Sequence, residues 1–259
     1  MTALQSDARL LQRIQDAELR ALADTFGETA VQPFGGLSLV STGTESSGAN
    51  RIAGVSPKTL DTLDQALEAL PEGDDRPWPC RIDVLPGAVD ASVADALFSR
   101  RFRHTGFESL MVGSPGDSEL DPNPGIEVVE PTQDWAFREF VQVFHDGFEI
   151  PAPDRRESSD LEHWSKGASL FLARLYGTPV SAGMLHEGEH GAFLLTCAST
   201  HVLRRQGGHQ ALVQHRLGHA AERGHDRVFA RVPFDGPAQR NLVRGGLRIA
   251  ATIAVWSRG

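Results

Sequence analysis

Hydrophobic and polar residues recur along this chain with two periods, one typical of helices and one typical of strands. Leu11, Ile14, Ala17 and Ala21 follow one another with helical spacing, which predicts an amphipathic helix. Ser56 is predicted to cap a second helix with Pro57 at its first position. The elements expected in the first half are helix 3–24, strands 36–41 and 51–55, helix 57–70, strand 81–85, helix 88–102 and strand 107–112.

The second half repeats much of this order. Its strands are short apolar runs, and a Tyr-Gly-Thr-Pro turn joins two of them. The expected elements are strand 126–129, helix 135–148, a short helix near 160–165, strands 170–175, 180–185 and 192–198, helix 208–223, strand 227–232, helix 236–244 and a last strand 247–256. Hairpin-joined strands mixed with helices predict an α+β fold, with a mixed, mostly antiparallel central sheet flanked by helices.

A stretch rich in proline and glycine divides the chain. Residues 113–125 read GSPGDSELDPNPG, a composition typical of a linker. The sequence therefore predicts an N-terminal α/β domain at 1–115, a linker at 113–125 and a second domain at 126–259. Because both halves share the order strand, strand, helix, strand, helix, strand, a diverged internal duplication is a hypothesis.

Composition narrows the class of protein. Hydrophobic residues make up 40% and charged residues 23% of the 259 positions, as in globular proteins. A net charge of −9 argues against nucleic acid and anionic membranes as partners. No apolar run reaches the roughly 18–20 residues that span a bilayer, and no signal peptide is visible. Cys80 and Cys197 form no disulfide framework, so a reducing cytoplasm is the expected location.

The segment with the clearest chemical pattern lies between strand 192–198 and helix 208–223. Arg204, Arg205, Gly207 and Gly208 stand in the connection. Free amides at a helix N-terminus, the helix dipole and the close approach that glycine allows together suit an anion such as a pyrophosphate. A tight turn with two solvated arginines is the alternative. Neither GxGxxG nor GxxxxGK[ST] is present, which disfavours NAD and nucleoside triphosphates.

Two motifs carry a family resemblance. RRQGGHQAL resembles the acyl-CoA-binding signature R/Q-x-x-G-x-G/A of the GNAT superfamily of N-acyltransferases, with Arg204 first, Gly207 at the central glycine and His209 in place of a small residue. AQRNLVRGGLRIAATIAVW resembles the closing motif of that family, with Gly246 and Leu247 at its step. The resemblance covers about residues 127–256. GANRIAGV in the first half is similar to tandem members, which suggests a degenerate GNAT-like N-terminal unit.

The resemblance implies acetyl-CoA as a co-substrate. Pantetheine would pair with the strand edge at Cys197–Ser199, the diphosphate would rest on the amides of 205–210, and Asn241 would lie near the thiol. The implied cofactor-binding residues are Cys197, Ala198, Ser199, Arg204, Arg205, Gln206, Gly207, Gly208, His209, Gln210 and Asn241. The implied function is transfer of an acetyl group to a primary amine, on a small molecule or peptide, by direct attack in a ternary complex. A non-catalytic acyl-CoA-binding or regulatory module is the alternative, and an interaction protein without a cofactor is a third reading.

The catalytic groups follow less directly. Leu242 occupies the position where many family members carry a tyrosine that acts as the general acid. The single tyrosine of this chain, Tyr176, falls in a turn. Glu189 is the preferred candidate base and His190 the second, although their turn also fits a solvated hairpin. His215 and His219 have a zinc-like spacing, but no third ligand is evident, so they are expected to be solvated and no metal is predicted. The acidic segment 149–162 would line an acceptor site or be a solvated loop, and the oligomeric state is left open.

Overall fold

The computed structural model describes residues 3–27, 30–41, 50–70, 79–88, 90–116, 118, 120–121, 123–150 and 166–258. The chain forms two compact units: unit 1 holds residues 1–25 and 111–250, and unit 2 holds residues 26–110 and 251–259. Within the described ranges, no helix combines the length and apolarity needed to cross a membrane.

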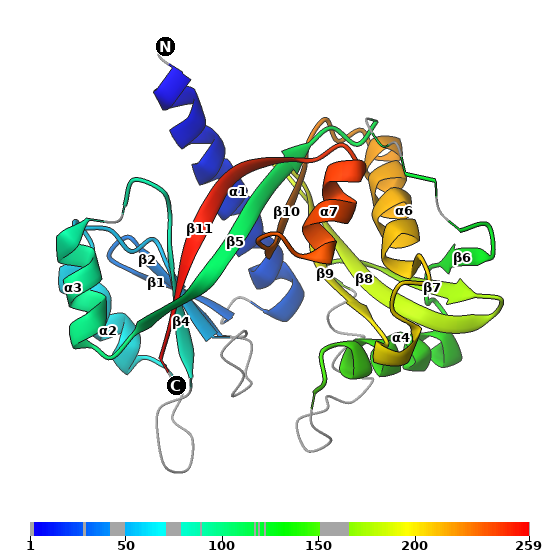
Figure 1. The fold of residues 1–259 in the computed structure, drawn as a ribbon, viewed down its shortest axis with the longest axis horizontal. Helices are drawn as coiled ribbons and strands as arrows, with labels where there is room; N and C mark the ends of the chain where they lie inside the picture. Colours follow the sequence, from blue (N-terminus) through cyan, green and yellow to red (C-terminus); the bar gives the residue numbers. More distant parts are fainter. Residues whose placement is uncertain are drawn as a thin grey trace. The chain divides into compact units, whose positions relative to one another are not determined.

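Unit 1 is a sheet with helices on both faces (Figure 1). It contains α1 (Ala3–Phe26, up to Thr25), β6 (Ile126–Val129), α4 (Asp134–Gly147), β7 (Ser169–Leu175), β8 (Thr178–Gly188), β9 (Gly191–Ser199), the 3-10 turn η4 (His201–Leu203), α6 (Gly208–Glu222), β10 (Val228–Pro233) and α7 (Pro237–Arg244). β5 (Arg103–Gly113) and β11 (Arg248–Arg258) contribute one end to each unit.

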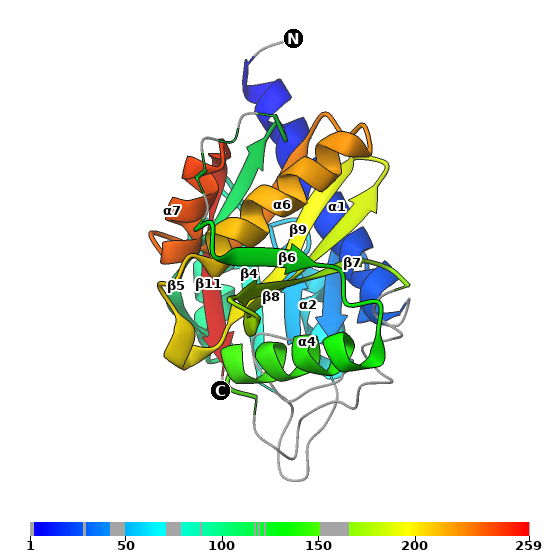
Figure 2. The same ribbon diagram turned by 90° about the vertical axis from the view of Figure 1, so that its right-hand side faces the viewer.

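The sheet of unit 1 has the strand order β5-β10-β9-β8-β7-β6. Neighbours from β6 to β9 are antiparallel, and β9 and β10 are parallel. Leu212 and Leu217 of α6 and Leu242 of α7 join Leu194 and Ala230 of the strands in one apolar core. The α4 helix contacts β8 and β9, and Figures 1 and 2 show these strands passing between α4 and α6. The connection between β9 and α6 therefore lies at one end of the sheet.

Local sequence explains several of these elements. Tyr176 (φ 47°) and Gly177 (φ 85°) form the two-residue turn between β7 and β8, with both residues in the left-handed region that a type I′ turn requires. The predicted strand 126–129 is confirmed without any change of boundary, and helices 135–148 and 208–223 shift by at most one residue. The short helix predicted near 160–165 falls outside the described residues.

Helix α1 packs in unit 1 although its sequence lies far from the other elements of that unit. Asp24 bonds to His186 on β8 at 2.8 Å, with the His186 side chain almost fully buried. Glu18 pairs with Arg231 on β10 at 3.4 Å, and both side chains are buried. These two ion pairs fix the C-terminal half of α1 against the sheet.

Unit 2 is a second, smaller α/β body. It contains β1 (Val31–Phe34), β2 (Leu37–Ser41), β3 (Asn50–Ala53), the 3-10 turn η2 (Leu60–Thr62), α2 (Leu63–Glu68), β4 (Cys80–Val84), α3 (Ala91–Ser99) and the remaining ends of β5 and β11. Its strand order is β1-β2-β3-β4-β11-β5, with β3 and β4 parallel. Leu39, Ile52, Ile82 and Leu97 are among the side chains of its core.

Two predictions in unit 2 need correction, and one strand was not predicted. The helix predicted at 57–70 starts later, because the Thr59 hydroxyl accepts from the Ser56 amide and donates to the Gly54 carbonyl, which makes Ser56 part of a turn and not a helix cap. The helix predicted at 88–102 starts at Ala91, because the Asp90 side chain accepts from the Val93 amide and caps it there. Strand β1 was not predicted, since its VQPF sequence lacks a clear alternation.

The mixed α+β class is confirmed, with a sheet whose strand pairs are mostly antiparallel. The compact units are interleaved in sequence: α1 belongs to unit 1, the end of β11 belongs to unit 2, and residues 113–125 lie inside unit 1. As a statement about separately folding domains, the division into 1–115 and 126–259 stays a prediction.

Candidate functional site

The two parallel strands of unit 1, β9 and β10, stop pairing midway along β9. Pairing with β10 is confined to Ala192–Leu194 against Val228–Ala230, whereas β9 continues to Ser199. Burial follows the pairing: β9 is buried up to Leu194 and partly exposed from Leu195 to Cys197. The edge of β9 beyond Leu194 therefore lacks a strand partner on the β10 side. Such an edge can pair with an amide-bearing ligand as if it were another strand.

A bulge marks the same point on the other side of β9. Gly183 faces Cys197 and Leu185 faces Leu194, so Met184 of β8 stands opposite two residues of β9, Leu195 and Thr196. This is the two-against-one arrangement of a β-bulge, which bends a strand and interrupts its ladder. The bend is the structural reason why β9 diverges from β10.

A buried arginine lies beneath the bulge. Arg216 on α6 is 1% exposed. Its Nε donates to the Leu212 carbonyl at 3.1 Å, and its Nη1 donates to the carbonyls of Met184 (2.9 Å) and Thr196 (3.5 Å). Both strand carbonyls belong to the bulge. Arg216 therefore supplies hydrogen bonds to carbonyls at the place where the ladder is interrupted.

The connection after β9 presents a row of main-chain amides. In the part of the chain that the structure describes, no protein oxygen accepts a hydrogen bond from the amides of residues 205–210, while the next amide, Ala211, bonds to the Gly207 carbonyl. Arg205 (φ 67°) and Gly207 (φ 94°) are in the left-handed region, and the residues between and after them are not. Alternating backbone conformations of this kind turn successive N–H groups towards one concavity that suits an anion.

The two glycines of the connection have different roles. A Cβ at Gly207 would lie 3.3 Å from Asn123 Cβ and 3.4 Å from Ile126 Cδ1, and its positive φ disfavours other residues. A Cβ at Gly208 would overlap Ser181 Oγ, so this glycine allows α6 to start directly against β8. Gly207 shapes the loop, and Gly208 sets how closely the helix approaches the sheet.

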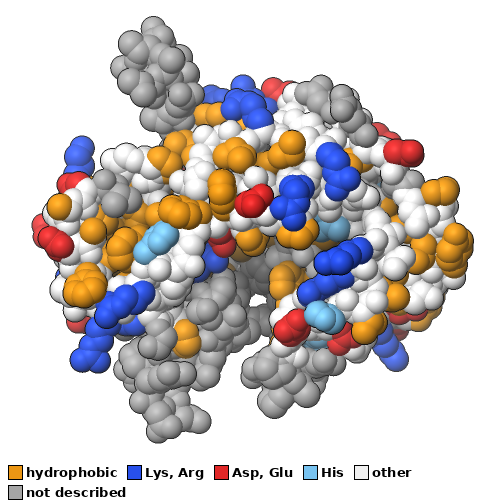
Figure 3. Space-filling view, viewed as in Figure 1, with side chains coloured by type: hydrophobic (Ala, Val, Ile, Leu, Met, Phe, Trp, Pro, Cys, Tyr) orange, Lys and Arg blue, Asp and Glu red, His pale blue; other side chains and the backbone are white. Residues whose placement is uncertain are grey.

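The arginines of the loop are at the surface. Arg204 is about half exposed, donates from Nη2 to the Gly147 carbonyl at 3.2 Å and lies 4.0 Å from the Glu149 carboxylate. Arg205 is exposed. In Figure 3, Lys and Arg side chains gather over α7 and the start of α6 on this face of unit 1. The loop therefore combines amides with fixed positive charge, as a phosphate site requires.

His209 and Asn241 join the first turns of α6 and α7. His209 Nδ1 lies 2.9 Å from Asn241 Nδ2, so the ring accepts at Nδ1 and carries its proton at Nε2. Burial, together with the positive charge of Arg216, lowers the pKa of His209 to about 4. Arg244 in turn donates to the Asn241 carbonyl oxygen. The residue that stands where the GNAT signature usually has a small one is thus a neutral, partly buried histidine.

The strand residues predicted to meet pantetheine lie on the open part of β9. Ser199 Oγ bonds to Ser181 Oγ at 2.6 Å, and Ala198 is buried against the Gly147 end of α4. Burial raises the pKa of the Cys197 thiol, and nearby Arg216 opposes part of that shift. Cys197 is therefore a packed thiol in contact with the buried arginine. The structure brings Cys197–Ser199, the 204–210 loop and Asn241 to the same end of unit 1.

Glu189 and His190 lie elsewhere. They form the turn between β8 and β9, before Gly191. The bulge begins at Leu195, four positions along β9 from Gly191, and at about 3.3 Å per residue it lies roughly 13 Å from the strand end that adjoins this turn. The structure does not bring these two residues to the loop, and their role as bases stays a prediction. His186, which precedes this turn on β8, is bonded to Asp24.

The two histidines on α6 differ: His215 is exposed, as expected, whereas His219 is packed and not solvated. The His219 side chain is 13% exposed and meets the Phe171 ring edge-on, with Glu187 at 3.7 Å. His215 contacts the same ring. Among the described residues, no group of three His, Cys, Asp or Glu side chains has the geometry to hold a metal ion.

An open cavity of about 820 Å³ lies at the opposite end of the unit 1 sheet. Its lining comes from the β6–α4 connection, the start of β7 and the end of β8, including Glu130, Arg138, Lys166 and Glu187. No residue of the 204–210 loop lines it. This cavity and the amide row are therefore separate features of unit 1.

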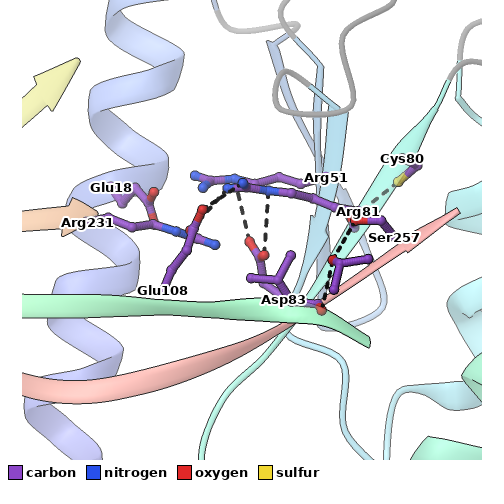
Figure 4. A network of polar contacts seen from close by, with 10 residues as sticks. Glu18, Arg51, Cys80, Arg81, Asp83, Glu108, Arg231 and Ser257 are labelled. Atoms are coloured by element: carbon purple, nitrogen blue, oxygen red, sulfur yellow. Dashed lines mark hydrogen bonds and ion pairs between the residues drawn. The ribbon is translucent and has the colours of Figure 1, made fainter. Parts of the chain in front are cut away.

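Unit 2 contains a parallel strand pair without such a row. β3 pairs with β4 at Arg51 and Ile52, and the segment after β3 bonds to itself through Thr59 and Ser56. A buried charge network lies on these strands: Arg81 bonds to Glu108 at 2.9 Å, and Asp83 lies 3.8 Å from Arg51 and 3.7 Å from Arg81 (Figure 4). Its two cations and two carboxylates balance, which is typical of a structural network.

Sequence reasoning missed Arg216 and the ion pairs of α1. Arg216 lies one helical turn from Leu212 and Val213, on the stripe of α6 that faces inward, and that position was the available signal. No local pattern links Glu18 to Arg231, because the two positions are 213 residues apart.

Comparisons with known proteins identify the fold. No family model and no curated protein matches the sequence. Among solved structures, a GCN5-related N-acetyltransferase from Kribbella flavida superposes with a TM-score of 0.63 at 17% identity, covering 95% of this chain and 94% of that one. One from Sphaerobacter thermophilus gives 0.63 at 13% identity, covering 86% and 76%. A tandem GNAT protein from the clavulanic acid biosynthesis pathway gives 0.53 at 14% identity, covering 86% and 78%.

At these identities the likeness concerns the fold, and it confirms the structural side of the resemblance that the two sequence motifs indicated. The splayed parallel pair, the bulged β9 and the glycine loop before α6 lie in the half of the chain that carries those motifs. This chain has the fold of the GCN5-related N-acetyltransferases.

Proposed function

We propose that this protein is an acetyl-CoA-dependent N-acetyltransferase that acts on a primary amine. One observation carries the proposal: residues 205–210 present six consecutive amides without a protein acceptor among the described residues, at the end of a strand that has just separated from its parallel neighbour. The loop suits a diphosphate and the strand edge suits an amide-bearing chain. Coenzyme A contains both groups in that order.

The residues of the site fit this ligand. The amides from Arg205 to Gln210 would bind the diphosphate, and Arg204 and Arg205 would add charge. The β9 edge at Cys197–Ser199 would pair with the pantetheine amides. Asn241 would lie beside the start of α6, where its bond to His209 orients it.

The bound donor would supply an activated acyl group, and the protein would place an amine against it. Direct attack needs a base for the ammonium proton and a means of stabilising the leaving thiolate. Leu242, at the position of the usual tyrosine, is buried in the apolar core and offers no proton. Glu189 and His190 stay candidate bases, with the separation from the bulge described above.

The acceptor is proposed as a small-molecule or peptide amine. Unit 2 is proposed as a degenerate GNAT-like unit in a tandem arrangement, supported by its own parallel pair β3–β4 and by the likeness to a tandem GNAT protein. Its loop after β3 uses its amides internally, so unit 2 would not bind a second coenzyme.

The buried Leu242 also favours a second candidate, a non-catalytic acyl-CoA-binding or regulatory module. Both functions require coenzyme binding, and only the first requires turnover. Release of free thiol from acetyl-CoA in the presence of a panel of amines, with the thiol measured by a colorimetric reagent, separates them. Tight binding without turnover over a broad panel would favour the module.

Binding itself is tested by calorimetry with acetyl-CoA on the wild type, Gly207→Val and Gly218→Ala. Valine at a position with φ 94°, facing Asn123 and Ile126, would displace the loop, so we expect at least a tenfold loss of affinity. Gly218 lies on the same helix with open space around its Cβ position, and its variant should bind like the wild type. A wild type that takes up no acetyl-CoA would refute the proposed function, and unchanged affinity in Gly207→Val would refute the assigned loop.

A further inference from the structure

Arg216 is more than a packing residue of α6: we propose that its guanidinium stabilises the negative charge that forms on the coenzyme sulfur as the acyl group leaves. The inference rests on the proposed function, because it requires coenzyme A to lie along β9. It assigns Arg216 as a positioning residue that acts through its charge from beneath the strand.

The first observation is a buried cation without a counter-charge. Arg216 is 1% exposed, and its hydrogen bonds go to the carbonyls of Leu212, Met184 and Thr196. Within the described residues it forms no ion pair with a carboxylate. Buried charges are normally paired, because desolvation is costly. Carbonyl dipoles compensate part of that cost, and an anion formed nearby would complete the compensation.

The second observation is the position of the Arg216 guanidinium, next to the unpaired part of β9. Thr196, whose carbonyl Arg216 holds, is a bulge residue and belongs to the part of β9 that β10 leaves unpaired. The Thr196 hydroxyl oxygen is also buried and has no hydrogen-bond partner among the described residues. A polar group without a partner marks the same short stretch of strand.

The third observation is the distance along the strand. From Ser199 back to Leu195 the edge measures about 13 Å, at roughly 3.3 Å per residue. A ligand anchored by its diphosphate on residues 205–210 and paired along this edge would reach the bulge with its far end. In coenzyme A that end carries the sulfur. The guanidinium would then lie on the other side of β9 from the reacting sulfur. The apolar core beneath α6 would exclude water from this region.

The neighbouring groups show how far this charge acts. Burial raises the pKa of the Cys197 thiol on β9, and the positive charge of Arg216 opposes part of that rise. Burial lowers the pKa of His209 and of His215, and the charge of Arg216 adds to the lowering at both. The charge of Arg216 would in the same way favour the thiolate form of a coenzyme thiol at the bulge.

The neutral amine nitrogen attacks the thioester carbonyl and forms the C–N bond, and the C–S bond breaks with its electron pair remaining on sulfur. The nitrogen loses one proton to a base or to water. The products are the amide, the thiolate and that proton, so the charge that Arg216 stabilises is created in the step itself.

The test measures the ionisation of bound coenzyme A and needs no acceptor. Thiolate absorbance in the near ultraviolet is followed against pH for the wild type saturated with CoA, and the signal with desulfo-CoA, which lacks the thiol, is subtracted to remove Cys80 and Cys197. Free CoA is titrated in parallel as the reference. We expect the thiol of bound CoA to ionise at a pH at least one unit lower than the thiol of free CoA.

Variants then assign the effect to Arg216. In Arg216→Met the depression should disappear, and in Arg216→Lys part of it should remain, whereas Arg223→Met, at the exposed end of the same helix, should match the wild type. If Arg216→Met does not fold, the wild-type and Arg216→Lys titrations still decide. A bound thiol that ionises like free CoA, or equally in wild type and Arg216→Met, overturns the inference. Failure of the wild type to bind either ligand instead overturns the proposed function.

Discussion

His209 illustrates how one partly buried residue couples the site to pH. Its pKa is lowered to about 4, mainly by burial and also by Arg216, against an ordinary value of 6.5. Below pH 6.5 His209 binds a proton in the unfolded chain but stays neutral in the folded chain. The free energy of unfolding therefore falls as the pH decreases from about 6.5 to about 4. At pH 5 the loss amounts to about 2 kcal/mol. Urea unfolding of the wild type at pH 7 and pH 5 measures it.

His209→Gln should remove most of this pH dependence, because glutamine has no proton to gain and can still bond to Asn241. His190→Gln is the matched control, since that histidine lies in the exposed β8–β9 turn. An equal drop in stability between pH 7 and pH 5 for wild type and His209→Gln would contradict the assignment of a neutral His209 with a lowered pKa.

At the same scale, the glycine loop was predictable and Arg216 was not. The segment RRQGGHQ indicates an anion site at the N-terminus of a helix, because left-handed glycine and free amides are properties of a few consecutive residues. The burial of Arg216 depends on the bulge between β8 and β9, which is a shift in the register of their pairing. A single sequence contains no signal for that register. An arginine among the inward-facing apolar residues of a helix therefore looks like an exception to the apolar pattern.

At the scale of elements, the N-terminal helix shows what periodicity can and cannot predict. Its apolar stripe indicated a helix, and the structure extends it to Phe26. Its partners follow from ion pairs between distant positions, Glu18 with Arg231 and Asp24 with His186. Helix existence is a local property, whereas the choice of sheet face depends on tertiary contacts that the pattern does not contain.

The Glu18–Arg231 pair gives an element-scale prediction. Glu18→Met leaves a buried guanidinium without this carboxylate, and the free energy of unfolding should fall by about 3 kcal/mol. The double variant Glu18→Met, Arg231→Met should recover most of that loss, since apolar side chains of similar volume tolerate the same burial. Chemical denaturation of the two variants and the wild type provides the comparison. Equal stability of the single variant and the wild type would show that the pair contributes nothing to docking of α1.

At the scale of the whole molecule, the interleaving of the units determines which pieces of chain can fold. Residues 126–259 were predicted as one domain, and they contain the loop, β9 and both motifs of the resemblance. They lack α1, with Glu18 and Asp24, and the Met111–Gly113 end of β5, which belong to unit 1. A Cβ at Gly113 would touch Gly246 and Leu247, so this end of β5 packs closely on the chain after α7.

A fragment of residues 126–259 should therefore be much less stable than the full chain, because it exposes the β10 edge next to β5 and leaves His186 and Arg231 without their partners on α1. A shortened chain that joins residues 1–25 to 111–259 through a flexible linker restores all of unit 1 and should recover both a cooperative thermal transition and acetyl-CoA binding. Circular dichroism melts and calorimetry on the two pieces measure this. If the fragment 126–259 melts cooperatively and binds the coenzyme as the full chain does, α1 and β5 are accessories to a domain that is complete without them; if only the longer piece does so, the coenzyme site depends on a helix that the sequence places more than a hundred residues before it.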